Sequence, residues 1–249
     1  MIHGLFFCLA ILIFGLPTAA AETLTVAVAS NFSRTAQALA SRYEETSGQP
    51  VRITTGSTGK LYAQIRNGAP YDALLAADQA RPRRLEEAGL AVGGSRFTYA
   101  EGRLAVWTRD RNLSLAELAS ALTGTGVRSI AIANPELAPY GRASRQALQS
   151  LGIWEELRDR IVMGENVGQT YALVATGNAT VGFVALSSVL DARHVGSHAG
   201  VRPELHAPIR QDAVLLRRGA GNDAATAFLA YLKTGRAREI IRRQGYDDG

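Results

Sequence analysis

Four short segments of this sequence place neutral hydrogen-bond donors where a strand-like run gives way to a helix-like run. In chain order they read VASNFS (28–33), TTGSTGKL (54–61), ANPELAPYGRAS (133–144) and GENVGQTYA (164–172). The candidate binding residues that they contain are Ser30, Asn31, Ser57, Thr58, Tyr140 and Val167. Five of these offer a hydroxyl or amide side chain, and Val167 offers its backbone N–H. Donors of this kind bind an anion without a full positive charge, so we expect an oxyanion ligand.

The starts of helices strengthen this expectation. The first N–H groups of a helix lack partners within the helix, and the helix dipole gives them a partial positive charge. Five to seven charge-assisted hydrogen bonds contribute on the order of 10–20 kcal/mol. Nanomolar capture requires about 12 kcal/mol after the costs of association. Uncharged donors that converge from several helix starts are therefore sufficient to hold a dianion.

Each candidate also has an ordinary structural explanation. Ser30 and Thr58 are good helix N-caps, Gly56 serves a tight turn, and Tyr140 can pack under a loop. Lys60 follows a GSTG run, but Thr54 and Leu61 stand where a phosphate-binding P-loop requires Gly and Ser or Thr. The prediction of a site therefore depends on the whole set of segments.

Strand-like and helix-like runs alternate along the chain. The expected strands are 23–30, 51–55, 71–78, 103–108, 129–134, 180–186 and 212–218, and the expected helices are 32–46, 60–66, 82–88, 142–151, 153–160, 168–176, 223–232 and 236–244. This alternation predicts an α/β fold with parallel sheet covered by helices on both faces. In such sheets, ligands bind beyond the carboxyl ends of the strands, where the four segments lie.

Two long extended segments, 96–108 and 207–216, indicate two α/β lobes joined by a two-strand hinge. We expect lobe 1 to contain residues 22–100 and 212–249, and lobe 2 to contain residues 101–211. The ligand would then lie in the cleft between the lobes.

The N-terminus has the pattern of an export signal. An apolar run from Gly4 to Leu16 is followed by Ala19-Ala20-Ala21, so residues 1–21 are expected to be a Sec-type signal peptide cleaved near Ala21. Cys8, the single cysteine, lies inside this run, which leaves the mature chain without a disulfide or a lipid anchor. The net charge of +5 comes without a basic stripe interleaved with aromatic residues, so nucleic acid is not an expected partner.

An ordered set of motifs in this chain resembles the periplasmic molybdate-binding proteins of ABC transporters. The motifs are VAVASNF (26–32), GSTGKLYAQIRNGAPYD (56–72), AADQ (76–79), GSRFTYAEGRLAVW (94–107), IANPELAPYG (132–141), ENVGQ (165–169) and GFVAL (182–186). The resemblance implies a type II periplasmic binding protein fold, a molybdate or tungstate ligand, and an ABC permease in the inner membrane as partner. It also implies a periplasmic monomer that needs no cofactor and is not an enzyme.

The resemblance maps the ligand positions of the family onto the six candidate residues. Molybdenum would be present only within the bound oxyanion, with no direct bond to a protein atom. One branch of the family has a ligand tyrosine where this chain has Ala185, whereas the branch with the APYG motif takes its phenol from the position of Tyr140. Thr58 stands where serine is more common in the family.

Two other functions stay open at this stage. A protein of the same fold could bind another oxyanion such as sulfate, which is also unprotonated at neutral pH and is excluded only by cavity size. An exported α/β enzyme would need a nucleophile with a base or a metal cluster, and no G-x-S-x-G motif is present. Asp72 and Asp78 are expected to cap or solvate strand ends, and Glu165 is expected to face away from the anion.

Overall fold

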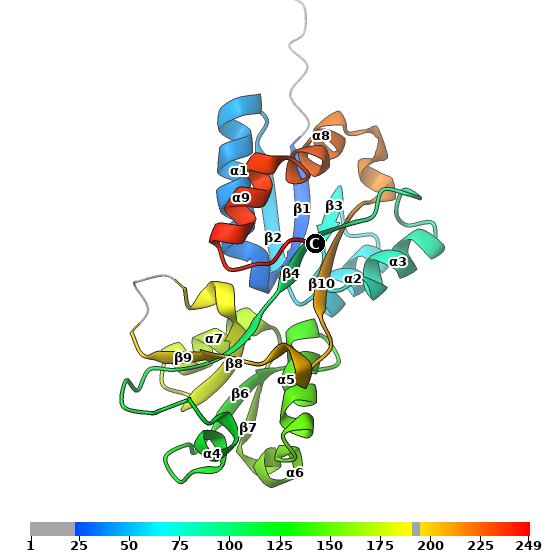
Figure 1. Cartoon of the computed structure of the whole chain (residues 1–249). Coiled ribbons are helices and arrows are strands. Elements are labelled where there is room, and N and C mark those ends of the chain that lie inside the picture. Colours follow the sequence, from blue (N-terminus) through cyan, green and yellow to red (C-terminus); the bar gives the residue numbers. More distant parts are fainter. Residues whose placement is uncertain (1–22, 191–194) are drawn as a thin grey trace, which may run out of the picture.

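The computed structural model describes residues 23–190 and 195–249, which form two α/β lobes stacked one above the other (Figure 1). The predicted signal peptide, residues 1–21 with Cys8, lies outside the described residues. Among the described residues, no helix combines the length and the apolar character that a membrane span requires.

Lobe 1 is built on a five-stranded sheet with the order β2-β1-β3-β10-β4. Its strands are β1 (Leu24–Ala29), β2 (Val51–Gly56), β3 (Ala73–Leu75), β4 (Phe97–Gly102) and β10 (Ile209–Leu215). Its helices are α1 (Ser33–Ser47), α2 (Thr58–Arg66), α3 (Ala80–Glu87), α8 (Asp223–Leu232) and α9 (Gly235–Arg243). Val26 and Val28 pack with α1, α8 and α9, whereas Ala27 faces α2 and α3 on the other side of the sheet. The alternation of side chains along β1 thus covers both faces of the sheet with helices.

Lobe 2 is built on a second five-stranded sheet with the order β7-β6-β8-β5-β9. Its strands are β5 (Leu104–Thr108), β6 (Ile130–Ala133), β7 (Ile161–Gly164), β8 (Val181–Ala185) and β9 (Ser197–Gly200). Its helices are α4 (Leu118–Thr123), α5 (Pro139–Ser150), α6 (Trp154–Leu157) and α7 (Val167–Ala175). Ile130 and Ile132 pack with α5 on one face, and Ala131 packs with Val174 of α7 on the other.

The two sheets repeat one topology. In lobe 1, β1 is parallel to β2 and β3, and β10 runs antiparallel between β3 and β4. In lobe 2, β6 is parallel to β7 and β8, and β5 runs antiparallel between β8 and β9. The chain crosses from lobe 1 to lobe 2 at Arg103 and returns over residues 201–208. Each crossing leads directly into the antiparallel strand of the lobe that it enters, which is β5 in lobe 2 and β10 in lobe 1. The fold class predicted from the sequence, a two-lobed α/β protein of the type II binding fold, is confirmed.

The prediction of purely parallel sheet is wrong, because β10 and β5 follow the crossings between the lobes and enter their sheets antiparallel to their neighbours. Some elements also differ from those expected. The predicted helix 153–160 is only the short α6 followed by a 3-10 turn, and β7, β9 and α4 were not predicted. β7 and β9 are the outer strands of the lobe 2 sheet, and Met163 of β7 is 56% exposed. β7 (IVMG) and β9 (SHAG) have only four residues each, and β9 has no apolar run, so neither gives the longer apolar or alternating pattern by which a strand is predicted from sequence.

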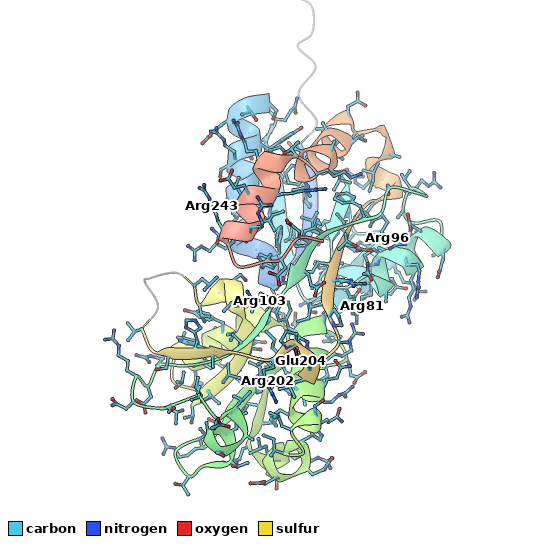
Figure 2. The ribbon with its side chains drawn as sticks, in the orientation of Figure 1. Arg81, Arg96, Arg103, Arg202, Glu204 and Arg243 are labelled. Carbon is cyan, nitrogen blue, oxygen red and sulfur yellow. The ribbon has the colours of Figure 1, made fainter. Side chains whose placement is uncertain are left out.

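A buried ion pair links β10, the strand that follows the second crossing, to neighbouring segments of lobe 1. The carboxylate of Asp212 is 0% exposed and accepts hydrogen bonds from Thr98 Oγ1 at 2.8 Å and from Gln79 Nε2 at 3.2 Å. Arg96 belongs to lobe 1 (Figure 2), and its Nη1 lies 2.6 Å from Asp212 Oδ2. Arg96 also pairs with Glu86. These carboxylates raise the pKa of Arg96 above its usual value. Arg96 therefore supplies the positive charge that compensates the buried carboxylate.

We predict that Arg96→Met lowers the free energy of unfolding by about 3 kcal/mol, because it leaves the Asp212 carboxylate buried without a counter-charge. Urea unfolding measures the change. Arg83→Met is the matched control, since Arg83 and Glu87 form an exposed pair on α3 whose loss costs about 0.5 kcal/mol. Equal effects of the two substitutions would show that the Asp212 pair adds nothing beyond a surface contact.

Candidate ligand site between the lobes

All six residues singled out from the sequence line one small cavity between the lobes. Its wall consists of Ala29, Ser30, Asn31, Gly56, Ser57, Thr58, Ala77, Ala138, Pro139, Tyr140 and Val167. The cavity volume of about 10 Å³ is about that needed for one water molecule when the lobes are this close. So small a space between the lobes favours a compact ligand.

Lobe 1 contributes the start of α2. Ser57 is the N-cap residue, and its Oγ accepts the N–H of Lys60 at 3.3 Å. Thr58 occupies the first helical position, and its Oγ1 accepts the N–H of Ala77 at 3.0 Å. Both hydroxyl oxygens therefore act as acceptors within the protein, which leaves their hydrogens for a ligand. The alternative that Thr58 is only an N-cap is wrong, because Ser57 holds that position.

The second contribution of lobe 1 is the 3-10 turn Ser30–Phe32, between β1 and α1. The Ser30 side chain makes no capping hydrogen bond, so the capping alternative is also wrong for Ser30. The Asn31 side chain is buried and donates from Nδ2 to Gln211 Oε1 at 2.8 Å. Ser30 lies at the cavity and against α7 of the other lobe, since a Cβ added to Gly168 would lie 3.6 Å from Ser30 Cβ.

Lobe 2 contributes the starts of α5 and α7. Pro139 and Tyr140 are the first two residues of α5, whose N-cap residue Ala138 offers no side-chain acceptor. Val167 is the first residue of α7, after the N-cap residue Asn166. The backbone N–H groups of Tyr140 and Val167 have no acceptor within their own helices, because both belong to a first turn. They point the positive ends of two helix dipoles toward the space between the lobes.

Electrostatically, the cavity is lined without any charged side chain among the described residues. The three carboxylates that the sequence analysis considered are engaged elsewhere. Asp72 Oδ2 accepts the N–H of Thr25 at 2.7 Å, Asp78 pairs with Arg81 and Arg142, and Glu165 pairs with Lys60. Asp78 caps the start of α3, because its Oδ1 accepts the N–H of Arg81 at 3.0 Å, and it also bridges the lobes through Arg142, which the sequence did not predict. Ala185, at the position of the alternative family tyrosine, is a buried core residue.

Tyr140 belongs to the cavity wall, and its buried phenol hydroxyl lacks a hydrogen-bond partner among the described residues. The residue is 2% exposed. Burial raises the pKa of the Tyr140 phenol well above 10.0, and the neighbouring Tyr246 raises it further, while the Asn31 side chain opposes the shift. The phenol therefore stays protonated and keeps a hydrogen to donate. An unpaired buried hydroxyl in a binding cavity indicates a polar ligand.

Residues that the sequence analysis missed lie behind the cavity and orient Asn31. Tyr246 Oη donates to the carbonyl of Asn31 at 2.6 Å, and Ser187 Oγ lies 2.9 Å from Tyr246 Oη. Gln211 is fully buried on β10, and its Oε1 accepts from Asn31 and lies 3.2 Å from Tyr99 Oη, whose single hydrogen is shared with the Ala76 carbonyl. No sequence pattern marks these residues, because they come together only through the hinge and the C-terminal segment.

The lobes touch each other beside the cavity, so the structure is that of a closed form. Gly59 N–H donates to the carbonyl of Leu137 at 2.8 Å, and Arg81 Nη2 donates to the carbonyl of Glu136 at 2.9 Å. Two ion pairs add to these contacts, Asp78–Arg142 at 3.3 Å and Lys60–Glu165 at 3.1 Å. Gly59 is required for this approach, because a Cβ there would lie 2.9 Å from the Leu137 oxygen.

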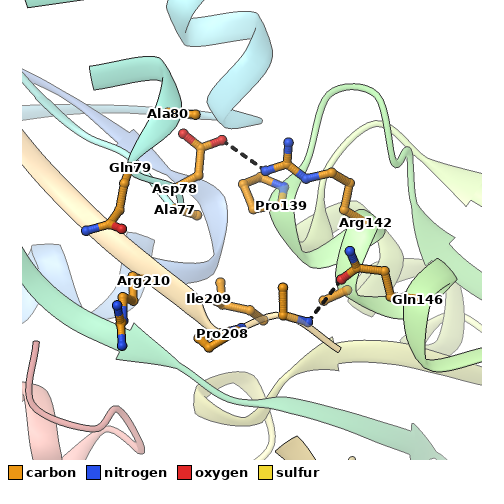
Figure 3. Close-up of a pocket in the computed structure, with 12 residues that line it drawn as sticks. Ala77, Asp78, Gln79, Ala80, Pro139, Arg142, Gln146, Pro208, Ile209 and Arg210 are labelled. Atoms are coloured by element: carbon orange, nitrogen blue, oxygen red, sulfur yellow. Dashed lines mark hydrogen bonds and ion pairs between the residues drawn. The ribbon is translucent and has the colours of Figure 1, made fainter. Parts of the chain in front are cut away.

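A larger groove of about 540 Å³ adjoins the cavity through Ala77 and Pro139 (Figure 3). Its polar groups already have partners: Asp78 faces Arg142, and Gln146 Oε1 accepts the N–H of Ala207. Gln79 and Arg210 of the wall also have partners, in Asp212 and Glu101, and its other residues are alanine, proline and Ile209. The smaller cavity, with its unpaired donors, is therefore the stronger candidate for the ligand site.

A two-lobed α/β fold with uncharged donors around a small interlobe cavity defines a class of proteins that capture small solutes. Residues 24–247 match the family model of bacterial extracellular solute-binding proteins, and the chain belongs to this family.

Among its relatives, the molybdate-binding protein ModA of Rhodobacter capsulatus is 44% identical over 93% of this chain and 90% of its own length. ModA of Azotobacter vinelandii is 43% identical over 92% and 91% of the two chains. The solved structure of the Azotobacter vinelandii periplasmic molybdate-binding protein superposes with a TM-score of 0.87 at 40% identity, covering 91% of this chain and 99% of that one.

The buried tyrosines predict how stability depends on pH. Burial also raises the pKa of Tyr246, to about 12, so its contribution to stability is complete below the unfolded-state pKa near 10 and is lost as pH rises through the folded-state value. Urea unfolding at rising alkaline pH should show this loss, which reaches about 1 kcal/mol by pH 11 for this residue. Tyr246→Phe should flatten the decline. Parallel declines in the two proteins would contradict the assignment to Tyr246.

Proposed function

We propose that this chain is the substrate-binding component of an ABC importer for molybdate, with tungstate as an equivalent ligand. The observation that carries the proposal is a cavity lined by uncharged donors from both lobes, one of which, Tyr140, has a buried hydroxyl without a partner among the described residues. The names of the 43–44% identical relatives support molybdate as the ligand. In this proposal the ligand contacts are Ser30, Asn31, Ser57, Thr58, Tyr140 and Val167.

The geometry of each donor determines the hydrogen bond that we propose for it. Ser57 and Thr58 use their oxygens as acceptors within lobe 1, so each directs its hydroxyl hydrogen to the ligand. Tyr140 donates its phenol hydrogen, and the first-turn amides of Tyr140 and Val167 bring the dipoles of α5 and α7. Ser30 and Asn31 complete the ring from the start of η1. The ligand would be held by hydrogen bonds from both lobes, with no metal–protein bond and no cofactor.

Selectivity follows from the protonation state and the size of the ligand. Molybdate and tungstate are unprotonated dianions at neutral pH and accept hydrogen bonds at all four oxygens. Phosphate retains a proton and needs an acceptor, whereas no carboxylate lines the cavity among the described residues. Sulfate carries the same charge as molybdate but is smaller, so it would leave several donors out of reach. The cost of unsatisfied buried donors then discriminates against it.

The proposed transport cycle uses the contacts between the lobes. The open form would receive the anion on one lobe, and closure about the two crossing segments would bring the donors of the other lobe to it. The monomeric closed form would then dock on a permease in the inner membrane after export to the periplasm and removal of the signal peptide near Ala21. No catalytic step is part of this proposal.

Isothermal titration calorimetry of the mature chain tests the ligand. We expect dissociation constants below about 1 μM for molybdate and tungstate, and affinities at least about 100-fold lower for sulfate and phosphate. Sulfate binding as tight as molybdate binding would replace the proposal by a sulfate-binding function. Absence of binding by all four anions would remove the oxyanion assignment.

A second prediction concerns closure. Gly59→Ala should weaken molybdate binding by about tenfold, because the new Cβ collides with Leu137 only when the lobes are closed. The thermal stability of the ligand-free protein should not fall, since Ala favours the first turn of α2 as much as Gly does or more. Gly235→Ala is the matched control: Gly235 begins α9, and a Cβ there would have no neighbour within 4 Å. Unchanged molybdate affinity in Gly59→Ala would show that the closed contacts do not contribute to binding.

A further inference from the structure

We infer that Gln211 is a positioning residue that turns the Tyr140 hydroxyl hydrogen toward the bound anion. The inference rests on the proposed function, because it concerns the same cavity. It adds a residue that does not line that cavity and that belongs to the crossing strand β10 of the opposite lobe. Two buried polar atoms without partners carry the argument.

The first step is the orientation of the Asn31 amide. Tyr246 has a single hydroxyl hydrogen, which it donates to the Asn31 carbonyl at 2.6 Å. Its oxygen can therefore only accept from Asn31, whose Nδ2 lies 3.4 Å away. This contact places Asn31 Nδ2, and not Oδ1, on the side of Tyr246 and Gln211.

The second step is the orientation of the Gln211 amide. Asn31 Nδ2 donates to Gln211 Oε1 at 2.8 Å, and Tyr99 Oη lies 3.2 Å from the same oxygen. An amide rotated by half a turn would place Nε2 against the Asn31 donor, so the acceptor must remain on this side. The Nε2 group is thereby directed away from Asn31 and Tyr99, and it has no partner among the described residues.

The third step is the meeting of the two unpaired atoms. Tyr140 Oη and Gln211 Nε2 both lie next to Gly102, the last residue of β4. A Cβ at Gly102 would collide with Tyr140 Oη and would lie 2.7 Å from Gln211 Nε2. Both Gln211 and Tyr140 are buried, so their polar groups have little access to bulk water. The missing side chain of Gly102 therefore leaves the Gln211 amide nitrogen and the Tyr140 hydroxyl next to the same position.

The consequence concerns the direction of the Tyr140 hydrogen. The neighbours of Tyr140 Oη are amide donors, Gln211 Nε2 and the Asn31 side chain, which already opposes the shift of the Tyr140 pKa. When Gln211 Nε2 donates to the phenol oxygen, directly or through one bridging water, the hydroxyl hydrogen has no acceptor behind it. The acceptor that remains is the anion in the cavity, and a phenol that accepts a hydrogen bond also becomes a stronger donor.

A double-mutant cycle read by molybdate calorimetry tests the inference. Tyr140→Phe alone should weaken binding by more than about tenfold, since it removes a hydrogen bond to a charged ligand. Gln211→Met alone should weaken binding by about fivefold to tenfold. In the Tyr140→Phe background, Gln211→Met should change the affinity by less than about twofold, because its effect acts through the missing hydroxyl.

A purely structural role predicts a different outcome. If Gln211 only supports the fold, its substitution would weaken binding by the same factor in both backgrounds, and that result would overturn the inference. Unchanged affinity in Gln211→Met alone would overturn it as well. Molybdate binding by the unsubstituted protein separates a failure of this inference from a failure of the proposed function.

Thermal unfolding of each ligand-free variant shows whether the comparison is made on folded protein. If Gln211→Met does not fold, Gln211→Asn takes its place, because it keeps a buried amide but withdraws the nitrogen from Tyr140 by one methylene. The same cycle applies to this variant. Coupling to Tyr140→Phe supports the inference, and equal effects in the two backgrounds reject it.

Discussion

The first N–H groups of a helix have no hydrogen-bond acceptor within that helix. Four such starts surround one cavity in this protein, and their unpaired donors determine which ligand the cavity can hold. The starts of α2, α5 and α7 and the turn before α1 each follow the carboxyl end of a strand, so the sheets fix their positions. Because the unpaired groups are amides and hydroxyls, a ligand can neutralise them only by accepting hydrogen bonds. The absence of charged side chains from the described wall of the cavity follows the same logic, since a lysine or arginine there would compete with the neutral donors.

The repeated topology of the lobes explains why these starts meet. In lobe 1 the site uses the ends of β1 and β2, and in lobe 2 it uses the ends of β6 and β7, which hold the same places in the sheet order. Ser30 and Tyr140 thus come from equivalent junctions, as do Thr58 and Val167. Each lobe offers half of a donor ring, and a ligand gains the full set only when the halves close. The glycine at position 59 and the contacts of Arg81 and Arg142 show how little space separates the closed halves.

The hinge strands also contribute residues that lie next to the Tyr140 hydroxyl. β4 and β10 lead to and from the crossings between the lobes, and Gly102 of β4 lies against both the Tyr140 hydroxyl and the Gln211 amide of β10. The C-terminal segment adds Tyr246, which holds the Asn31 carbonyl and contacts Ser187 of the other lobe. This polar network touches both lobes and the hinge. Its members are separated by up to 215 positions in the sequence, so it exists only in the folded chain.

The sequence by itself determined the alternation of strands and helices, the fold class and the residue types of the donor set, because these depend on local periodicity and on short motifs. It also placed Ser30, Thr58, Tyr140 and Val167 at strand-to-helix junctions, since each junction is contiguous in the chain. Only the tertiary structure decided that Ser57 rather than Thr58 caps α2, that Asp78 bridges the lobes, and that β7 and β9 form edges. It alone brought Gln211 and Tyr246 behind the cavity, because contacts between distant segments depend on how the two sheets are joined and not on any local pattern.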